Sequence, residues 1–129
     1  MILADTTIVI AYYRGRRGEI APVLQREVVA IAGVTRAEVL HGAKDASDVV
    51  RLLAALDEFV AVPTPETIWD DLGHMLRRLR LAGLTIPLSD VLIATIAISR
   101  GVPVWAFDAH YPMMQVAIPE LQLYKPATP

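Results

Sequence analysis

Apolar and polar positions along the chain follow two alternating patterns. Short continuous apolar runs, rich in Val, Ile and aromatic residues, are typical of strands buried on both faces. These runs are Ile2–Ala4, Val28–Val34, Phe59–Val62 and Val102–Phe107, with a final edge strand expected at Leu121–Tyr124. Because helical patterns separate the runs, the sequence predicts an α/β fold. We expect a three-layer α/β/α sandwich with a central parallel sheet of four to five strands.

Helices are predicted between these runs, where turn-forming residues bound each periodic pattern. The expected helices are Thr6–Tyr13, Glu19–Arg26, Thr35–Ala43, Ser47–Glu58, Pro65–Ala82, Asp90–Arg100 and His110–Val116. The first could instead continue the opening strand, but Asp5 or Thr6 can cap a helix and Gly15 can end it. Pro22 is expected inside the first turn of the second helix. Ser89 is expected to cap the helix that follows it.

The bulk composition limits the classes of protein that remain. The chain fits a single domain, residues 1–129, since no repeat or linker divides it. No apolar stretch reaches the roughly 20 residues of a membrane span, and the start lacks the basic region of a signal peptide. The absence of cysteine excludes disulfides and thiolate zinc sites. We therefore expect a cytoplasmic protein without a membrane segment.

Four acidic residues stand near the points where a strand leads into a helix. They are Asp5, Glu38, Asp90 and Asp108. Ligands of open α/β sheets bind beyond the carboxyl ends of the strands. Carboxylates gathered there repel one another unless a cation neutralises them, and their oxygens suit Mg²⁺ or Mn²⁺. The pattern indicates a metal-dependent enzyme that acts on phosphate chemistry.

Each of these acids also has a purely structural explanation. Asp5 can cap a helix, and Asp108 can be an ordinary turn residue. Asp90 in a first helical turn complements the helix dipole. Thr35 and Glu38 have the spacing of a capping box, in which the glutamate reaches back to the threonine amide. The occurrence of all four acids at one sheet edge favours function. Four uncompensated carboxylates there would cost roughly several kcal/mol in mutual repulsion.

Taken in order, these segments resemble the motifs of PIN-domain ribonucleases, and specifically of the VapC toxins of bacterial and archaeal toxin–antitoxin pairs. The segments that carry the resemblance are Ile2–Thr7, Val34–Gly42, Ser89–Ala94 and Gly101–Asp108. The resemblance extends to about residue 124. The family usually has Ser or Thr two residues before its final Asp, where this chain has Ala106. A further acid often follows that Asp, and here His110 stands two residues on.

The resemblance implies a Mg²⁺- or Mn²⁺-dependent endoribonuclease that is the toxin of a type II toxin–antitoxin system. The implied catalytic residues are Asp5, Glu38, Asp90 and Asp108. Of these, Asp5, Asp90 and Asp108 are the implied metal ligands, and Thr6 is a supporting hydroxyl behind them. Metal ions held by carboxylates lower the pKa of bound water and neutralise developing charge, which is the chemistry that phosphodiester hydrolysis needs.

The expected partners are RNA, a second copy of the chain and a cognate VapB-type antitoxin. Arg14, Arg16 and Arg17 are candidate RNA-binding residues, although an ordinary basic loop explains them equally well. An antitoxin segment would bind an apolar groove. The apolar sides of Ile8–Tyr13 and Val49–Leu56 are candidates for that groove, and packing in the core is the alternative.

Other functions remain to be weighed against this one. A catalytically weakened PIN-like module that acts mainly by binding RNA or a protein partner is the main alternative, because Ala106 removes a hydroxyl that normally supports the site. A receiver domain is disfavoured, since the only lysines are Lys44 and Lys125 and neither is well placed. A haloacid-dehalogenase-like phosphatase would need a second aspartate where Thr7 stands.

Overall fold

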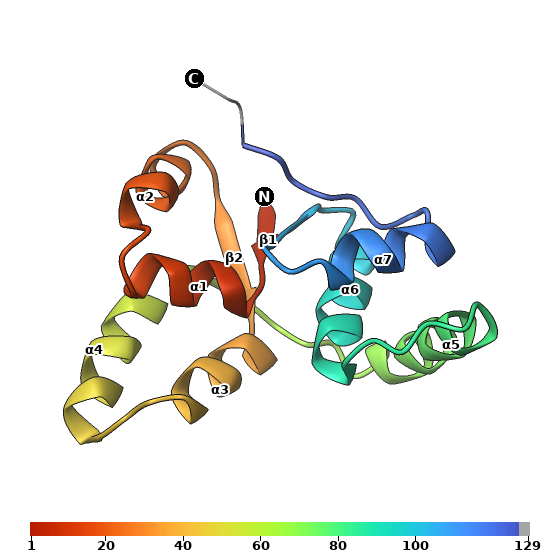
Figure 1. The fold of residues 1–129 in the computed structure, drawn as a ribbon, viewed down its shortest axis with the longest axis horizontal. Helices are drawn as coiled ribbons and strands as arrows, with labels where there is room; N and C mark the ends of the chain where they lie inside the picture. Colours follow the sequence, from red (N-terminus) through yellow and green to blue (C-terminus); the bar gives the residue numbers. More distant parts are fainter. Residues whose placement is uncertain (127–129) are drawn as a thin grey trace.

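The computed structural model describes residues 1–126 and has three layers (Figure 1). Its middle layer is a four-stranded sheet in which every neighbouring pair of strands is parallel. The strands are β1 (Ile2–Ala4), β2 (Val29–Ala32), β3 (Val60–Val62) and β4 (Val104–Trp105). Their order in the sheet is β3-β2-β1-β4. The predicted α/β/α architecture is confirmed.

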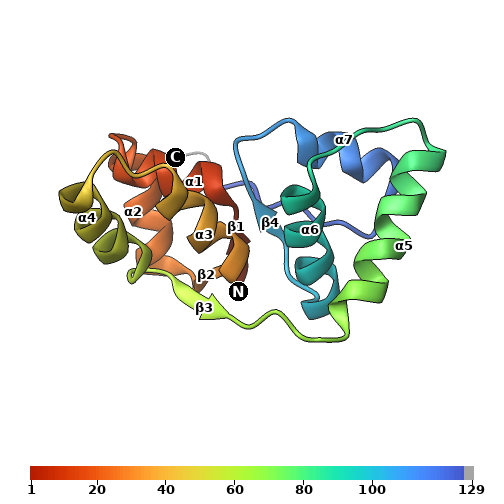
Figure 2. The same ribbon diagram turned by 90° about the horizontal axis from the view of Figure 1, so that it is seen from below.

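Helices cover both faces of the sheet. One face carries α1 (Thr6–Tyr13), α2 (Arg17–Arg26), α3 (Gly33–His41) and α4 (Ala46–Leu56). The other carries α5 (Ile68–Leu81), α6 (Leu88–Arg100) and α7 (His110–Ala117). Figure 2 shows these two groups on opposite sides of the strands. None of the helices in residues 1–126 is long and apolar enough to cross a membrane.

The strands divide their side chains between two apolar cores. Leu3 and Ala30 pack with the residues of α5, α6 and α7. Their neighbours Ile2 and Ile31 point the other way and pack with α1, α2 and α4. This alternation follows from the two-residue period of a strand, and it buries both faces, as an all-parallel sheet requires.

The apolar sides of α1 and α4 belong to the core. Ile8 and Val9 of α1 are fully buried, and so is Leu52 of α4. Core packing therefore explains why these two helices are apolar, and their buried residues do not form an open groove for an antitoxin.

The strand order creates a topological switch point between β1 and β4. From β1 the chain moves outward through β2 and β3, and it returns as β4 on the other side of β1. Leu3 pairs with Val104 and Ala4 with Trp105, so the carboxyl ends of these two strands are aligned. Open α/β proteins bind their ligands at such points.

Several boundaries differ from the prediction. The strand expected at Val28–Val34 ends at Ala32, because the next two residues already belong to α3. The strand expected at Val102–Phe107 is reduced to the two residues of β4. The edge strand expected at Leu121–Tyr124 is wrong in extent, since it contributes a single parallel bridge from Leu123 to β4. A two-residue strand offers too short a ladder for longer pairing.

Four predicted helix starts are also wrong. The fifth helix, expected from Pro65, begins at Ile68, because the two residues between them form a turn. The second helix begins at Arg17, so Pro22 is its sixth residue and lies beyond the first turn. The third helix begins at Gly33, two residues before Thr35. The sixth begins after Pro87, which places Ser89 inside the first turn instead of at the cap. In the second, third and sixth helices, the chain enters the helix earlier than the local signal indicated.

The predicted start and end of α1 are confirmed. The Asp5 carboxylate accepts hydrogen bonds from the backbone N–H groups of Thr7 and Ile8, as a helix cap does. The helix ends at Tyr13, and Gly15 follows with φ +126°. Glycine adopts this left-handed conformation without the steric cost that a side chain imposes.

Candidate functional site

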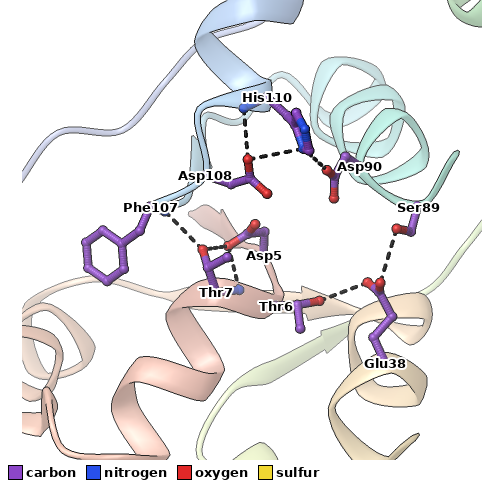
Figure 3. Close-up of polar contacts among 9 residues, drawn as sticks. All are labelled: Asp5, Thr6, Thr7, Glu38, Ser89, Asp90, Phe107, Asp108 and His110. Atoms are coloured by element: carbon purple, nitrogen blue, oxygen red, sulfur yellow. Dashed lines mark hydrogen bonds and ion pairs between the residues drawn. The ribbon is translucent and has the colours of Figure 1, made fainter. Parts of the chain in front are cut away.

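The four predicted acids surround a common site at the switch point (Figure 3). Asp5 directly follows β1, and Asp108 lies in the loop after β4. Glu38 is on α3, and Asp90 is in the first turn of α6. We call Asp5, Glu38, Asp90 and Asp108 the carboxylate cluster. Residues that are up to about a hundred positions apart in the sequence thus meet in space, as the sequence predicted.

Asp5 is both a helix cap and a member of the cluster. It is only 1% exposed. Its Oδ1 atom accepts the N–H of Thr7 at 3.0 Å, the N–H of Ile8 at 3.3 Å and the hydroxyl of Thr7 at 2.5 Å. Its other oxygen points toward the centre of the cluster (Figure 3). Capping therefore fixes the side chain without using both of its oxygens.

Thr7 is a site residue that the sequence reasoning missed. Its hydroxyl oxygen accepts the N–H of Phe107 at 3.0 Å while its hydroxyl donates to Asp5. The start of α1 is thereby tied to the loop that carries Asp108. Ala106, where the family usually has a hydroxyl, packs against the apolar core of α5–α7. The signal that pointed to Thr7 was a hydroxyl two residues after a capping aspartate.

Glu38 is held by two hydroxyl groups from other elements. Its Oε1 accepts the Thr6 hydroxyl at 2.9 Å, and its Oε2 accepts the Ser89 hydroxyl at 3.1 Å. The predicted capping box is wrong, because Thr35 does not cap α3 and its buried hydroxyl has no hydrogen-bond partner within residues 1–126. Ser89 likewise serves Glu38 instead of a cap. Thr6, predicted as a supporting hydroxyl, orients Glu38.

His110 joins the cluster from the start of α7. Its Nδ1 atom lies 2.9 Å from Asp90 Oδ2 and 3.1 Å from Asp108 Oδ1. Its backbone N–H also donates to Asp108 Oδ1 at 2.9 Å. Ligand atoms of Asp90, Asp108 and His110 all lie within 4.8 Å of one another. Asp5 is not in this group of three, and its role as a metal ligand stays a prediction.

The environment of the cluster favours positive charge. Burial raises the pKa of Asp5 to about 6, opposed by the hydrogen bonds from Thr7 and Ile8 and reinforced by the charge of Asp90. Burial also raises the pKa of Asp90, although the hydrogen bond from His110 opposes it. The same hydrogen bond raises the pKa of His110. Protons are thus held more tightly here than by isolated groups.

Tyr111 has a buried hydroxyl that the charges of the carboxylate cluster influence. Its side chain is 1% exposed, and the hydroxyl has no hydrogen-bond partner within residues 1–126. Burial raises the pKa of Tyr111, and so do the negative charges of all four carboxylates, which means that these lie nearby. A buried hydroxyl without a partner among the described residues, close to acids, fits a site that a ligand or water completes.

The donor set fits a divalent ion. Carboxylate oxygens are the preferred ligands of Mg²⁺ and Mn²⁺, and imidazole nitrogen suits the transition metals. Asp90, Asp108 and His110 offer two oxygens and one nitrogen at a spacing that one ion can bridge. A divalent cation would also offset the repulsion that the neighbouring carboxylates impose on Asp90.

The predicted RNA-binding arginines are each paired with an acid. Arg14 contacts Asp48 at 4.0 Å, Arg16 contacts Glu19 at 2.8 Å and Arg17 contacts Glu58 at 3.4 Å. Arg16 is also linked to the cluster, because its guanidinium lies 4.0 Å above the ring of Phe107, the residue before Asp108. The role of all three in RNA binding stays a prediction.

Comparisons with known proteins find the same fold in other chains. Among solved structures, the chain is similar to VapBC2 from Rickettsia felis bound to a promoter DNA fragment (TM-score 0.80, 19% identity, 96% of this chain and 98% of that chain covered). It is also similar to VapBC-1 from nontypeable Haemophilus influenzae (TM-score 0.80, 22% identity, 97% and 98% covered). A third similar structure is Mycobacterium tuberculosis VapC20, a Sarcin-Ricin loop cleaving toxin (TM-score 0.69, 14% identity, 88% and 94% covered).

At these identities the similarity shows a shared fold. None of the curated proteins matches the chain by sequence. The sequence model of the PIN domain, however, matches residues 2–116, which span all four strands and include every member of the carboxylate cluster. With that match, and with the acids placed at the switch point of the sheet, the chain belongs to the PIN-domain family.

Proposed function

We propose that this protein is a Mg²⁺- or Mn²⁺-dependent endoribonuclease and the toxin of a type II toxin–antitoxin pair. One observation carries the proposal. The ligand atoms of Asp90, Asp108 and His110 lie within 4.8 Å of one another beside Asp5 and Glu38, in a chain of the PIN-domain family. The similarity to a toxin that cleaves the Sarcin-Ricin loop supports RNA as the substrate class.

Each residue of the cluster has a role that follows from its contacts. Asp90 and Asp108 would hold the ion, with His110 beside them and Asp5 as the further ligand that the resemblance implies. When bound, a divalent ion lowers the pKa of water and neutralises charge on the leaving oxygen. Glu38 is fixed through both of its oxygens by Thr6 and Ser89, so it would add a negative charge to the site at a fixed position.

The proposed partners follow from the similar structures. Several of these are toxin–antitoxin assemblies, such as VapBC-1 from Haemophilus influenzae and a toxin–antitoxin complex from Klebsiella pneumoniae. They support a cognate VapB-type antitoxin for this chain, and a homodimer and a cytoplasmic location are part of the same proposal.

A second candidate is a weakened PIN-like module that acts mainly by binding RNA or a protein. Ala106 favours it, because no hydroxyl stands two residues before Asp108. Thr7 argues against a serious loss, since its hydroxyl links Asp5 to the backbone of Phe107 in the same loop. Activity measurements separate the two candidates.

Replacing Asp90 by Asn should abolish cleavage of single-stranded RNA. The amide removes one negative charge from the group of three that would hold the ion. A bound ion stabilises the charge of the transition state by roughly several kcal/mol. Its loss corresponds to a fall in cleavage rate of about 100-fold or more. Cleavage of a fluorophore-labelled RNA is followed with Mn²⁺, with Mg²⁺ and with EDTA.

Asp70→Asn is the matched control, because Asp70 is an exposed aspartate on α5, outside the cluster. It should cleave at the wild-type rate. If the wild-type protein binds RNA but does not cleave it with either ion, the nuclease proposal is wrong. The binding module is then the better candidate.

A further inference from the structure

Phe107 is an exposed aromatic residue at the edge of the carboxylate cluster. Its side chain is 43% exposed although burial of such a ring stabilises a fold by about 1.5–3 kcal/mol. Its backbone N–H is bonded to Thr7, which in turn bonds Asp5, so the network that holds Asp5 also fixes the position of Phe107. Figure 3 shows the ring directed away from the carboxylates.

Arg16 forms a cation–π contact with the ring of Phe107. Its guanidinium lies 4.0 Å above the ring centroid, and two hydrogen bonds to Glu19, at 2.8 Å and 3.1 Å, hold it there. Guanidinium planes and aromatic rings are the two groups on which proteins stack unpaired bases. Both are present here, because Phe107 directly precedes Asp108 in the chain and the Arg16 guanidinium lies on its ring.

A cleft of about 210 Å³ continues from Phe107 along the same loop. Its walls include Ala106, Phe107, Asp108, Tyr124 and Lys125. The volume is below the roughly 300–1,000 Å³ of drug-sized pockets, so it suits a ligand of about one ring system. The methyl group of Ala106 keeps one wall apolar, and the charge of Lys125 complements a phosphate.

Asp108 belongs to both the cleft and the carboxylate cluster. A strand of RNA whose phosphate lies at the cluster would therefore have a neighbouring base within reach of the cleft. The ring of Phe107, the guanidinium of Arg16 on that ring and the ammonium group of Lys125 in the cleft wall suit a base and its phosphate. The chemistry of the occupant is that of a nucleotide.

We propose that Phe107, backed by Arg16, is a stacking platform for one unpaired base of the RNA substrate. The platform would hold the base next to the phosphate at the carboxylate cluster and so contribute to the choice of cleavage site. This inference rests on the proposed function, because it takes RNA as the ligand of the cluster.

The test measures RNA affinity apart from cleavage. Phe107→Ala and Phe107→Tyr are made in an Asp90→Asn background, and electrophoresis checks that the RNA stays intact. Fluorescence anisotropy with short single-stranded RNAs should show that Phe107→Ala weakens binding by about 5- to 100-fold, the range for loss of one base–aromatic stack. Phe107→Tyr should bind as tightly as the unchanged background.

Two controls make the result specific. Trp69→Ala removes another exposed aromatic residue, 57% exposed on α5, and should leave RNA affinity unchanged. A series of RNAs in which one nucleotide at a time lacks its base should contain one member that binds weakly to the Asp90→Asn protein. That same RNA should lose no further affinity when Phe107→Ala is added.

Equal affinity of the Phe107→Ala protein and its background would overturn the inference, and so would a loss that tyrosine does not restore. Absence of any RNA binding would overturn it as well. The proposed nuclease fails separately, through a wild-type protein that does not cleave RNA. If the wild type cleaves RNA but Phe107→Ala does not change RNA affinity, the proposed nuclease is supported. The proposed stacking platform is then wrong.

Discussion

Two buried aspartates near α1 have opposite surroundings. Asp5 is 1% exposed and Asp48 is 3% exposed. Asp48 accepts a hydrogen bond from the Tyr13 hydroxyl. It also lies 4.0 Å from the guanidinium of Arg14 and 3.7 Å from that of Arg51. Asp5 instead shares its site with three other acids.

The two aspartates therefore differ in pKa. The hydrogen bond from Tyr13 lowers the pKa of Asp48, and the N–H of Lys44 and the two arginines add to this effect. Burial raises the pKa of Asp5 to about 6. The chain itself neutralises Asp48, which is a structural link between α1 and α4. The chain gives Asp5 and its acidic neighbours too few cationic partners to balance their negative charge. This imbalance distinguishes a cation site from a structural ion pair.

The largest expected contrast is in stability when each aspartate becomes asparagine. The pKa of Asp5 is about 6 in the fold against an ordinary 3.8, so ionisation destabilises the folded state. This cost is absent below pH 3.8 and complete above pH 6. Asp5→Asn keeps a capping oxygen but cannot ionise. In EDTA above pH 6 it should be more stable than wild type, by up to about 3 kcal/mol.

The same change at Asp48 should have the opposite sign. Because the fold lowers the pKa of Asp48, its ionised form stabilises the protein above the ordinary pKa of 3.8, and this contribution is lost at lower pH. Asp48→Asn should therefore lower the melting temperature at neutral pH. Thermal unfolding between pH 3 and pH 8 measures both variants. Shifts of equal sign at pH 7 would contradict the comparison.

The second contrast is the response to metal. Mn²⁺ at about 100 times its Kd should stabilise the wild-type protein by about 2.7 kcal/mol, because it binds only the folded state. Asp90→Asn removes a member of the ligand group and should lose this shift. Asp48→Asn should keep the stabilisation by Mn²⁺, measured against the same variant without Mn²⁺. Differential scanning fluorimetry with and without Mn²⁺ gives the shifts, and an undiminished response of Asp90→Asn would exclude the assigned site.

The smallest contrast concerns two tyrosines. Tyr111→Phe removes a hydroxyl without a hydrogen-bond partner in the described part of the chain, so stability in EDTA should rise by up to about 1 kcal/mol. Tyr13→Phe removes the donor to Asp48 and should lower the melting temperature. Equilibrium unfolding in urea compares the two. A loss of stability in Tyr111→Phe would mean that its hydroxyl is already satisfied.

Local signals predicted part of this fold well. The cap at Asp5, the extent of α1 and the start of α7 at His110 depend on neighbours within about four residues, which the sequence displays directly. The strands were placed correctly but too long at Val28–Val34 and Val102–Phe107, because apolar composition does not show where a partner strand ends.

Local signals failed where a distant residue supplied the partner. Glu38 has the spacing of a capping box, yet its hydrogen bonds go to Thr6 and Ser89, which are 32 and 51 positions away. Ser89 has the local position of a cap, before the expected helix, but its hydroxyl donates to the distant Glu38. Thr7 gave a weak signal, because its link to Phe107 spans 100 positions.

The sequence alone determined the order of strands and helices and the four acids at their junctions, because periodicity and turn residues are local properties of the chain. Tertiary structure decided which side chains complete the site. It brought His110 to Asp90 and Asp108, bound Glu38 with two hydroxyls, and left the hydroxyl of Tyr111 without a partner among residues 1–126. Those contacts depend on the packing of β1, β4 and α6, and energies of packing belong to the folded chain as a whole.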